Sequence, residues 1–271
     1  MGKLYYTVGQ AKYWYEIDGE GVPIVMLHGF TGSSKTWQHV KSLFGSGNQI
    51  IVIDLPGHGK TKASHVTTMQ RCCADLHMLF QFLGLGKIHL VGYSMGGRTA
   101  LSFALHYPAM IQSLILESSS PGIANEAERR LRIEADKKLA ERIERDGVQA
   151  FVDYWQDIPL FASQKSLPSK VKESIRRERV SHTAEGLAQS LRAMGTGTQE
   201  SWWSELESFE RPVQLVVGAL DTKFIATNKK MHTLLKSSKM IVCEHAGHAI
   251  HVEKPEIFGK LVREFIDSVT D

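Results

Sequence analysis

The chain has 271 residues, of which 42% are hydrophobic and 23% charged, and its 32 Lys and Arg against 29 Asp and Glu leave a formal charge of +3. This is the composition of an ordinary globular protein, and so small a basic excess does not indicate binding to nucleic acid or to a membrane surface. No segment reaches the roughly 20 apolar residues that a membrane span needs. The first ten residues, MGKLYYTVGQ, lack the apolar stretch of a secretory signal. We therefore expect a cytoplasmic protein that binds neither nucleic acid nor a membrane.

Short apolar runs alternate with helical patterns along much of the chain. Six runs are expected to form strands, at residues 24–28, 49–54, 88–92, 113–117, 213–218 and 239–244. Helical patterns are found at residues 68–83, 94–106, 227–235 and 255–269. Continuous apolar runs are typical of strands that are buried on both faces of a parallel sheet. The alternation predicts an α/β fold with a mostly parallel, doubly wound sheet.

Residues 118–211 interrupt this alternation, because they show helical periodicity and charge but no convincing strand. An insertion of this length between two strands favours a helical lid over the carboxyl ends of the strands, where ligands bind in open α/β folds. We therefore predict a core formed by residues 1–117 and 212–271 and a helical lid formed by residues 118–211.

The strongest chemical signal is GYSMGG at residues 92–97, which matches G-x-S-x-G with Ser94 as the nucleophile. An apolar run, IHLV, precedes it and a helical pattern follows it. Small neighbours allow the backbone to turn sharply from strand to helix and to raise the serine hydroxyl above the sheet. In this context the motif predicts an α/β-hydrolase fold with a nucleophile elbow.

A second motif, HGF, directly follows the first predicted parallel strand. In the α/β-hydrolase fold this loop supplies one amide of the oxyanion hole, and the residue after the nucleophile supplies the other. We therefore assign the backbone N–H groups of Phe30 and Met95 to the oxyanion hole. His28 is expected to have a structural role in the same loop.

The acid and the base of a catalytic triad are expected later in the chain. Asp221 follows the run at residues 213–218 and is the preferred acid, with Glu117 as the competing candidate. The segment EHAGHAIHVEKP places three histidines at intervals of three, but it reads as a loop and lacks the helical H-x-x-x-H geometry of a zinc site. We assign His248 as the general base and leave His245 and His251 as structural or surface residues. The order Ser94, Asp221, His248 is the order of this fold.

No cofactor or metal is expected. The segment DLPGHGKT ends like a phosphate-binding P-loop, but that motif requires a glycine five residues before Gly59, where the chain has Asp54. A loop that follows the strand at residues 49–54 is the better interpretation.

Seven segments together resemble one family, the 2-succinyl-6-hydroxy-2,4-cyclohexadiene-1-carboxylate synthases (MenH). They are HGFTGSSKTW, DLPGHGKT, GYSMGGR, SPGIANEAERRLR, PLFASQ, LDTKF and AGHAIHVEKP, and they extend over residues 28–255. The resemblance implies a lyase of menaquinone biosynthesis that expels pyruvate from 2-succinyl-5-enolpyruvyl-6-hydroxy-3-cyclohexene-1-carboxylate. The triad motifs alone would fit many hydrolases, whereas the arginine that ends GYSMGGR and the lid segments are more discriminating.

The substrate that this resemblance implies is a small tricarboxylate, so its pocket needs several cationic groups, and arginine binds carboxylates in a bidentate way. Arg98 lies one helical turn after Ser94, which predicts a position near the pocket mouth. Arg132 in the predicted lid and Arg179 in RRERVSH match the family's other carboxylate-binding arginines. Arg98→Ala is expected to reduce turnover sharply and to spare the fold.

Aromatic residues complete the predicted pocket. Tyr93 precedes the nucleophile, as it does in the family. The segment FVDYWQDIPLF leaves open whether Trp155 or Tyr154 fills an aromatic position in the pocket, with core packing as the alternative for both. Trp37 matches the family as well, and for this residue packing and ligand contact are equally compatible with the sequence.

The reaction that we expect begins when Ser94, deprotonated by His248, removes a ring proton beside the succinyl ketone. The enolate then expels enolpyruvate. Two alternatives remain open from sequence alone: an ester or carbon–carbon bond hydrolase with Ser94 as a true nucleophile, and a non-catalytic ligand receptor on the same fold. A monomer or a small homo-oligomer is expected.

Overall fold

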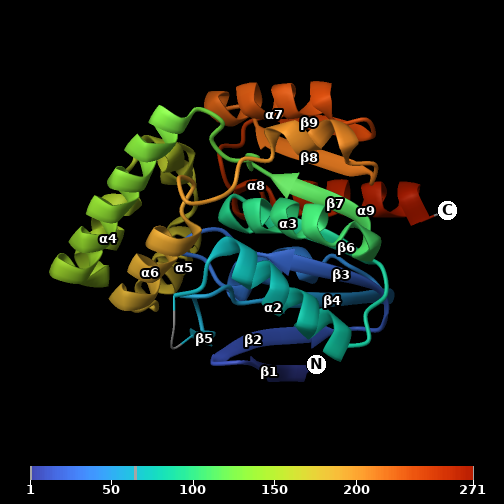
Figure 1. The fold of residues 1–271 in the computed structure, drawn as a ribbon, viewed down its shortest axis with the longest axis horizontal. Coiled ribbons are helices and arrows are strands. Elements are labelled where there is room, and N and C mark those ends of the chain that lie inside the picture. The colour runs from blue at the N-terminus through green and yellow to red at the C-terminus, as the bar shows by residue number, and fades with distance from the viewer. Residues whose placement is uncertain (1, 64–65, 271) are drawn as a thin grey trace.

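A computed structural model describes residues 2–63 and 66–270. Within these residues nine strands form one sheet in the order β1-β2-β4-β3-β6-β7-β8-β9, and the short β5 pairs with β2 (Figure 1). Six strands run parallel to one another: β3 (Gly21–Leu27), β4 (Gly47–Ile53), β6 (Ile88–Tyr93), β7 (Ile111–Glu117), β8 (Val213–Gly218) and β9 (Ser238–Cys243). These are the six apolar runs of the sequence, and the predicted α/β fold with a mostly parallel sheet is confirmed.

Three strands have no counterpart in the sequence prediction. β1 (Gly2–Val8) and β2 (Ala11–Asp18) form an antiparallel hairpin at one edge, where β2 also pairs antiparallel with β4 and with β5 (Lys62–Ala63). Antiparallel edge strands are partly exposed to solvent, so polar residues interrupt their apolar pattern. The sheet is therefore mixed at this edge.

Helices cover both faces of the sheet. On β3, Val25 and Leu27 pack into one apolar cluster, whereas Ile24 and Met26 pack into the other, as the two-residue period of a strand dictates. The first cluster lies beneath α2 (Met69–Phe82), α3 (Met95–His106) and α7 (Thr222–Leu234), and the second beneath η1 (Ser34–Trp37), α1 (Gln38–Lys41), α8 (Ile250–Glu253) and α9 (Pro255–Thr270). The loops that hold the candidate site residues follow the carboxyl ends of the parallel strands β3, β6, β8 and β9.

The chain between β7 and β8 contains helices and no strand. Its elements are α4 (Glu126–Trp155), η3 (Pro159–Ser166), α5 (Ser169–Val180), α6 (Ala184–Met194) and η4 (Trp203–Ser208), and Figure 1 shows α4, α5 and α6 as a separate layer beside the sheet. A third apolar cluster holds α4 and α6 together, and Phe30 of the core packs against it. The function of this layer as a lid stays a prediction.

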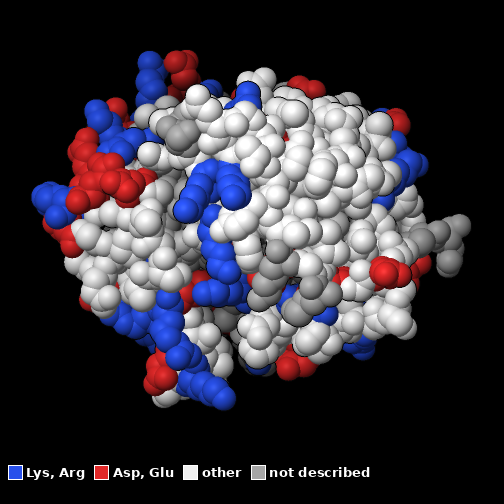
Figure 2. Space-filling view, turned by 90° about the horizontal axis from the view of Figure 1, so that it is seen from below, with Lys and Arg blue, Asp and Glu red and all other residues white. Residues whose placement is uncertain are grey.

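Charged side chains are distributed unevenly over the surface. Basic and acidic groups mix at the end formed by the helical layer, and a band of Lys and Arg crosses the middle of the face in Figure 2.

No helix within residues 2–63 and 66–270 is both long enough and apolar enough to cross a membrane.

Candidate active site

Ser94 occupies a strained turn between β6 and α3. Its backbone has φ 50° and ψ −107°, in the region that residues other than glycine rarely adopt. A side chain at Gly97 would lie 2.6 Å from Cβ of Ser119, and one at Gly92 would collide with the carbonyl oxygen of Gly96. Glycine is therefore required at both positions, and the sharp turn presents the serine side chain above the sheet.

The side chains of Ser94, His248 and Asp221 form a continuous hydrogen-bonded chain. His248 Nδ1 lies 2.6 Å from Asp221 Oδ2, and His248 Nε2 lies 3.0 Å from Ser94 Oγ. Only 1% of His248 and 7% of Asp221 is exposed, so this chain is shielded from solvent. A proton on Nδ1 bonds the carboxylate and leaves Nε2 free to accept the serine proton. The geometry suits proton abstraction by Ser94 or nucleophilic attack by it.

Glu117, the competing acid, has a different partner. Its Oε1 accepts hydrogen bonds from the backbone N–H and from Nδ1 of His251, both at 3.0 Å. Both side chains are fully buried, and His251 Nε2 lies 2.8 Å from Thr36 Oγ1. The sequence alone predicts a structural or surface residue at His251 and no role for Thr36. The spacing of three between His248 and His251 was the available signal, but only the fold shows the partner of each.

The loop after β3 lies beside the elbow because β3 and β6 are neighbours in register. His28 is fully buried there: its Nε2 accepts the backbone N–H of Leu55 at 2.9 Å, so Nδ1 donates to the carbonyl of Gly29 at 2.8 Å. Burial lowers the pKa of His28, so the ring stays neutral. The side chain holds the loop that carries Phe30, as the sequence analysis expects. Met95 begins α3, where backbone N–H groups lack partners within the helix.

Arg98 lies deeper than its spacing from Ser94 suggests. Its exposed fraction is 8%, and its Nη1 donates at 2.9 Å both to the carbonyl of Met194 and to Oε1 of Gln199. Burial, together with the nearby charge of Arg132, lowers the pKa of Arg98 to about 10. The side chain therefore remains charged at neutral pH, but it is held by the helical layer and does not stand at an open mouth.

Arg132 on α4 is bound by a carboxylate of its own helix. Its Nε donates to Asp136 Oδ1 at 2.8 Å, one turn further along α4. About 40% of the Arg132 side chain is exposed, whereas Asp136 is buried and its Oδ2 has no partner within the described residues. A substrate carboxylate at Arg132 would thus compete with Asp136.

Arg179 differs from the other two arginines because it lines open space. A cavity of about 810 Å³ between α5 and the core is lined by Arg179, Phe30, Tyr93 and Ala249, among other residues. Tyr93 and Ala249 are the chain neighbours of Ser94 and His248, although the triad residues are not themselves among the lining residues.

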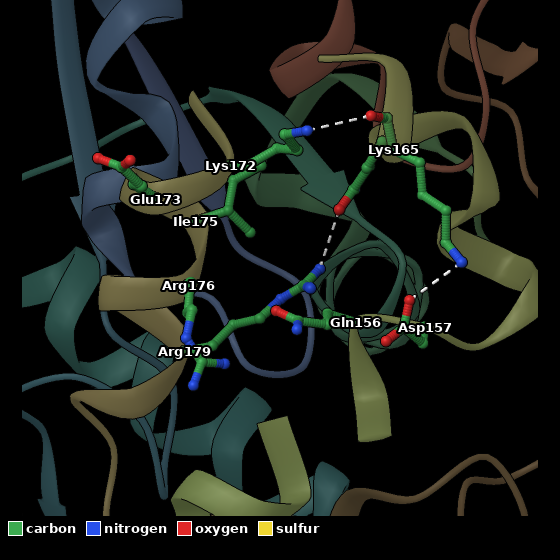
Figure 3. Close-up of a pocket in the computed structure, with 9 residues that line it drawn as sticks. Gln156, Asp157, Lys165, Lys172, Glu173, Ile175, Arg176 and Arg179 are labelled. Atoms are coloured by element: carbon green, nitrogen blue, oxygen red, sulfur yellow. Dashed lines mark hydrogen bonds and ion pairs between the residues drawn. The ribbon is translucent and has the colours of Figure 1, made fainter. Parts of the chain in front are cut away.

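The guanidinium of Arg179 is nearly buried, with 6% exposed, and it donates to Gln164 Oε1 at 3.2 Å and lies over the ring of Phe161. No carboxylate of the described residues lies within 4 Å of it. A second cavity of about 370 Å³ lies on its other side, where Lys172 and Lys165 are found (Figure 3). Burial lowers the pKa of Arg179, and the nearby charge of Glu178 opposes this shift. A buried cation without a direct ion pair favours an anionic ligand.

The aromatic candidates separate into two groups. The ring of Trp155 packs edge-on against Phe30 at 5.6 Å, and its Nε1 is buried with no partner in the part of the chain that the structure describes. Tyr154 is 44% exposed beneath Arg142, whereas Trp155 contacts Phe30 of the loop after β3. Trp37 is fully buried, and its ring lies 4.5 Å from that of His251 at an angle of 36°, so the structure shows it as a packed side chain.

Two contacts that the sequence did not predict join the helical layer to the loop after β3. Glu178 on α5 accepts a hydrogen bond at 2.8 Å from the backbone N–H of Ser33. His182 Nε2 donates to the carbonyl of Thr31 at 2.9 Å, and its Nδ1 accepts from the N–H of Gly59. The helical layer is therefore closed onto the loop that carries Phe30.

Comparison with known proteins is consistent with this geometry. The family described as alpha/beta hydrolase fold matches residues 22–255. A Bacillus subtilis protein that is provisionally named 2-succinyl-6-hydroxy-2,4-cyclohexadiene-1-carboxylate synthase is 46% identical over 99% of this chain and 100% of its own length. The synthase of that name from Serratia proteamaculans is 30% identical over 90% of this chain and 92% of its own length. The chain belongs to this synthase family.

The solved structure of MenH from S. aureus supports the same placement, with 34% identity, a TM-score of 0.92, and coverage of 95% of this chain and 99% of that one. A thermophilic esterase from Thermogutta terrifontis, solved with malate bound, is also similar, at 28% identity and a TM-score of 0.87 over 99% of both chains. The fold thus serves more than one chemistry. The resemblance to MenH that the sequence indicated is confirmed.

Proposed function

We propose that this MenH-family enzyme eliminates pyruvate from 2-succinyl-5-enolpyruvyl-6-hydroxy-3-cyclohexene-1-carboxylate and so forms 2-succinyl-6-hydroxy-2,4-cyclohexadiene-1-carboxylate in menaquinone biosynthesis. The observation that carries the proposal is Arg179, a buried arginine without a carboxylate ion-pair partner in the described residues, on the wall of a cavity that also includes Tyr93 and Ala249, the chain neighbours of Ser94 and His248. A hydrolase for neutral esters has no need for a buried cation there. The names of the relatives also favour the synthase over the hydrolase and receptor alternatives.

In the proposed mechanism Ser94 acts as a base. His248 takes the Ser94 proton on Nε2, while Asp221 stabilises the resulting imidazolium through Nδ1. The serine oxygen then removes the ring proton beside the succinyl ketone, and negative charge develops on the ketone oxygen. The backbone N–H groups of Phe30 and Met95 stabilise that charge, and one such donor contributes roughly 3 kcal/mol in comparable sites.

The enolate collapses and expels enolpyruvate, which leaves the conjugated diene. Arg179 binds one substrate carboxylate directly. Arg132 binds a second substrate carboxylate when its bond to Asp136 breaks. The buried positive charge of Arg98 adds to the electrostatic attraction for the anionic substrate. Tyr93, which lines the cavity, and Trp155, which packs against Phe30, supply the aromatic groups of the proposed site. A cytoplasmic location and a monomeric or small homo-oligomeric state accompany this proposal as predictions.

The test is direct. The purified protein is incubated with the enolpyruvyl substrate, and pyruvate release is measured together with diene absorbance. We expect both products to appear at equal rates and to disappear in Ser94→Ala. Product formation no faster than in buffer would reject the synthase proposal, whereas an acyl group trapped on Ser94 would favour the hydrolase.

A further inference from the structure

A second carboxylate–imidazole–hydroxyl chain lies next to the triad. Glu117 Oε2 is 2.9 Å from His251 Nδ1, and His251 Nε2 is 2.8 Å from Thr36 Oγ1. In the triad the corresponding distances are 2.6 Å and 3.0 Å. The second chain therefore has the connectivity and the dimensions of a proton relay, with a carboxylate at one end and a hydroxyl at the other.

The two ends of this second chain differ in accessibility. Glu117 and His251 are buried to the same degree as Asp221 and His248, whereas Thr36 is only partly buried and lies in η1. Thr36 and His251 both line the cavity of about 810 Å³, together with Tyr93 and Arg179. The second hydroxyl therefore opens into a cavity whose wall includes Tyr93 and Ala249, the chain neighbours of Ser94 and His248.

The proposed elimination leaves one chemical task unassigned. The triad removes a proton from the ring, and it can return that proton to the departing oxygen only after the first transfer is complete. A second donor at the departing oxygen would let protonation accompany the cleavage of the carbon–oxygen bond. The leaving group is a carboxylate-bearing enol ether oxygen, and protonation of that oxygen as the carbon–oxygen bond breaks lowers the barrier. The cavity wall carries both cations and carboxylates, the latter being Glu178, Glu253 and Glu256. Lys35, beside Thr36, and Arg179 are the cations that would hold the carboxylate of this group.

We propose that Thr36, His251 and Glu117 form a proton-donating relay for the leaving group, an inference that rests on the proposed synthase function. The Thr36 hydroxyl gives its proton to the ether oxygen, which keeps the electron pair of the broken bond. The relay starts with protons on both ring nitrogens of His251, with Nδ1–H bonded to the Glu117 carboxylate, which balances the imidazolium charge. The Nε2 proton replaces the one that Thr36 gives up. The neutral imidazole then takes up a proton from water, and the triad releases the ring proton to water in turn. The ring proton goes to the triad, its bonding electrons form the new double bond, and the released enol becomes pyruvate.

The test compares Thr36→Val, which removes the hydroxyl at nearly constant volume, with Thr36→Ser, which keeps it. Thr227→Val is the matched control, because Thr227 is a threonine on α7 that is partly buried like Thr36 and whose hydroxyl donates to the carbonyl of Lys223 in its own helix. We expect kcat to fall by on the order of 100-fold in Thr36→Val, with little change in KM. Thr36→Ser and Thr227→Val are expected to remain near the wild type.

The decisive measurement uses a substrate whose enolpyruvyl group carries fluorine on its methylene carbon, since a more acidic leaving group needs less protonation. The proposal predicts that the loss in Thr36→Val shrinks to below about 10-fold on this substrate. An equal loss on both substrates would assign Thr36 a structural role and overturn the relay, as would an unchanged kcat. Wild-type inactivity on both substrates would instead reject the synthase function and the relay with it.

Discussion

The carbonyl oxygen of Glu117 accepts the backbone N–H of Ser94 at 2.9 Å, and the carboxylate of the same residue accepts the backbone N–H of His251 at 3.0 Å. His251 is three residues beyond His248. One buried residue at the end of β7 therefore fixes both the strained turn that carries the serine and the loop that carries the histidine base. This arrangement explains why a carboxylate is buried at a position that the triad does not use.

Asp221→Asn tests the orientation of the base. The amide preserves the shape of the side chain but no longer accepts the Nδ1 proton as a carboxylate, so the imidazole favours the wrong tautomer. In a serine protease the same change lowers kcat by about 10⁴-fold. We expect a decrease of roughly 10³- to 10⁴-fold in pyruvate release with an unchanged unfolding temperature. Near-normal turnover would show that Asp221 is not the acid.

Arg179→Ala tests the anion site. Hydrogen bonds to charged groups contribute about 1.5–3 kcal/mol, so KM for the tricarboxylate is expected to rise by roughly 10- to 100-fold. Loss of the buried cation leaves Gln164 free to bond water that enters the cavity, so the fold is expected to persist. The control is Arg130→Ala, which removes an exposed arginine of α4. An equal KM in both variants would contradict a substrate carboxylate at Arg179.

Arg98→Ala is expected to affect stability as well as turnover, in contrast to the expectation from sequence alone. The substitution leaves the carbonyl of Met194 and Oε1 of Gln199 unpaired in a buried site. Each buried group without a partner costs about 1–3 kcal/mol. Urea denaturation should therefore show a free energy of unfolding lower by about 2 kcal/mol or more. A variant of full stability would mean that water replaces the guanidinium.

Four buried histidines with lowered pKa values predict that the free energy of unfolding decreases at acidic pH. Burial lowers the pKa of His182 and of His89 to about 4, and it also lowers the pKa values of His28 and His58. Below about pH 6.5 the unfolded chain binds protons at these positions and the folded chain does not. The contribution of these four histidines to the free energy of unfolding is therefore fully present above about pH 6.5 and is lost as the pH falls toward 4.

Each proton that the unfolded chain binds and the folded chain does not bind changes the slope of the free energy of unfolding against pH by up to about 1.4 kcal/mol per pH unit. Thermal or urea unfolding between pH 7 and pH 5 measures the slope. His182→Gln should flatten it by about 1 kcal/mol per unit between pH 6 and pH 5, whereas His39→Gln, at an exposed position, should not. Identical slopes in the two variants would show that His182 is not buried as a neutral ring in solution.

The sequence by itself determined the parallel strands, the elbow and the residues of the triad. These features depend on local patterns: continuous apolar runs, glycines at fixed intervals around Ser94, and the order of serine, aspartate and histidine along the chain. Each pattern reflects a requirement of one turn or one strand, so it can be read without knowledge of distant contacts. The edge strands were missed because their polar residues interrupt the apolar pattern.

Only the tertiary structure decided which partner each charged side chain has. Arg98 bonds residues about a hundred positions away, and Glu117 bonds His251 across 134 positions. The sheet order and the packing of the helical layer bring these segments together. Hydrogen bonds and burial therefore depend on the whole fold, and local spacing carries no information about them. For this reason the sequence placed Arg98 near a pocket mouth, whereas the fold buries it and leaves Arg179 facing the cavity.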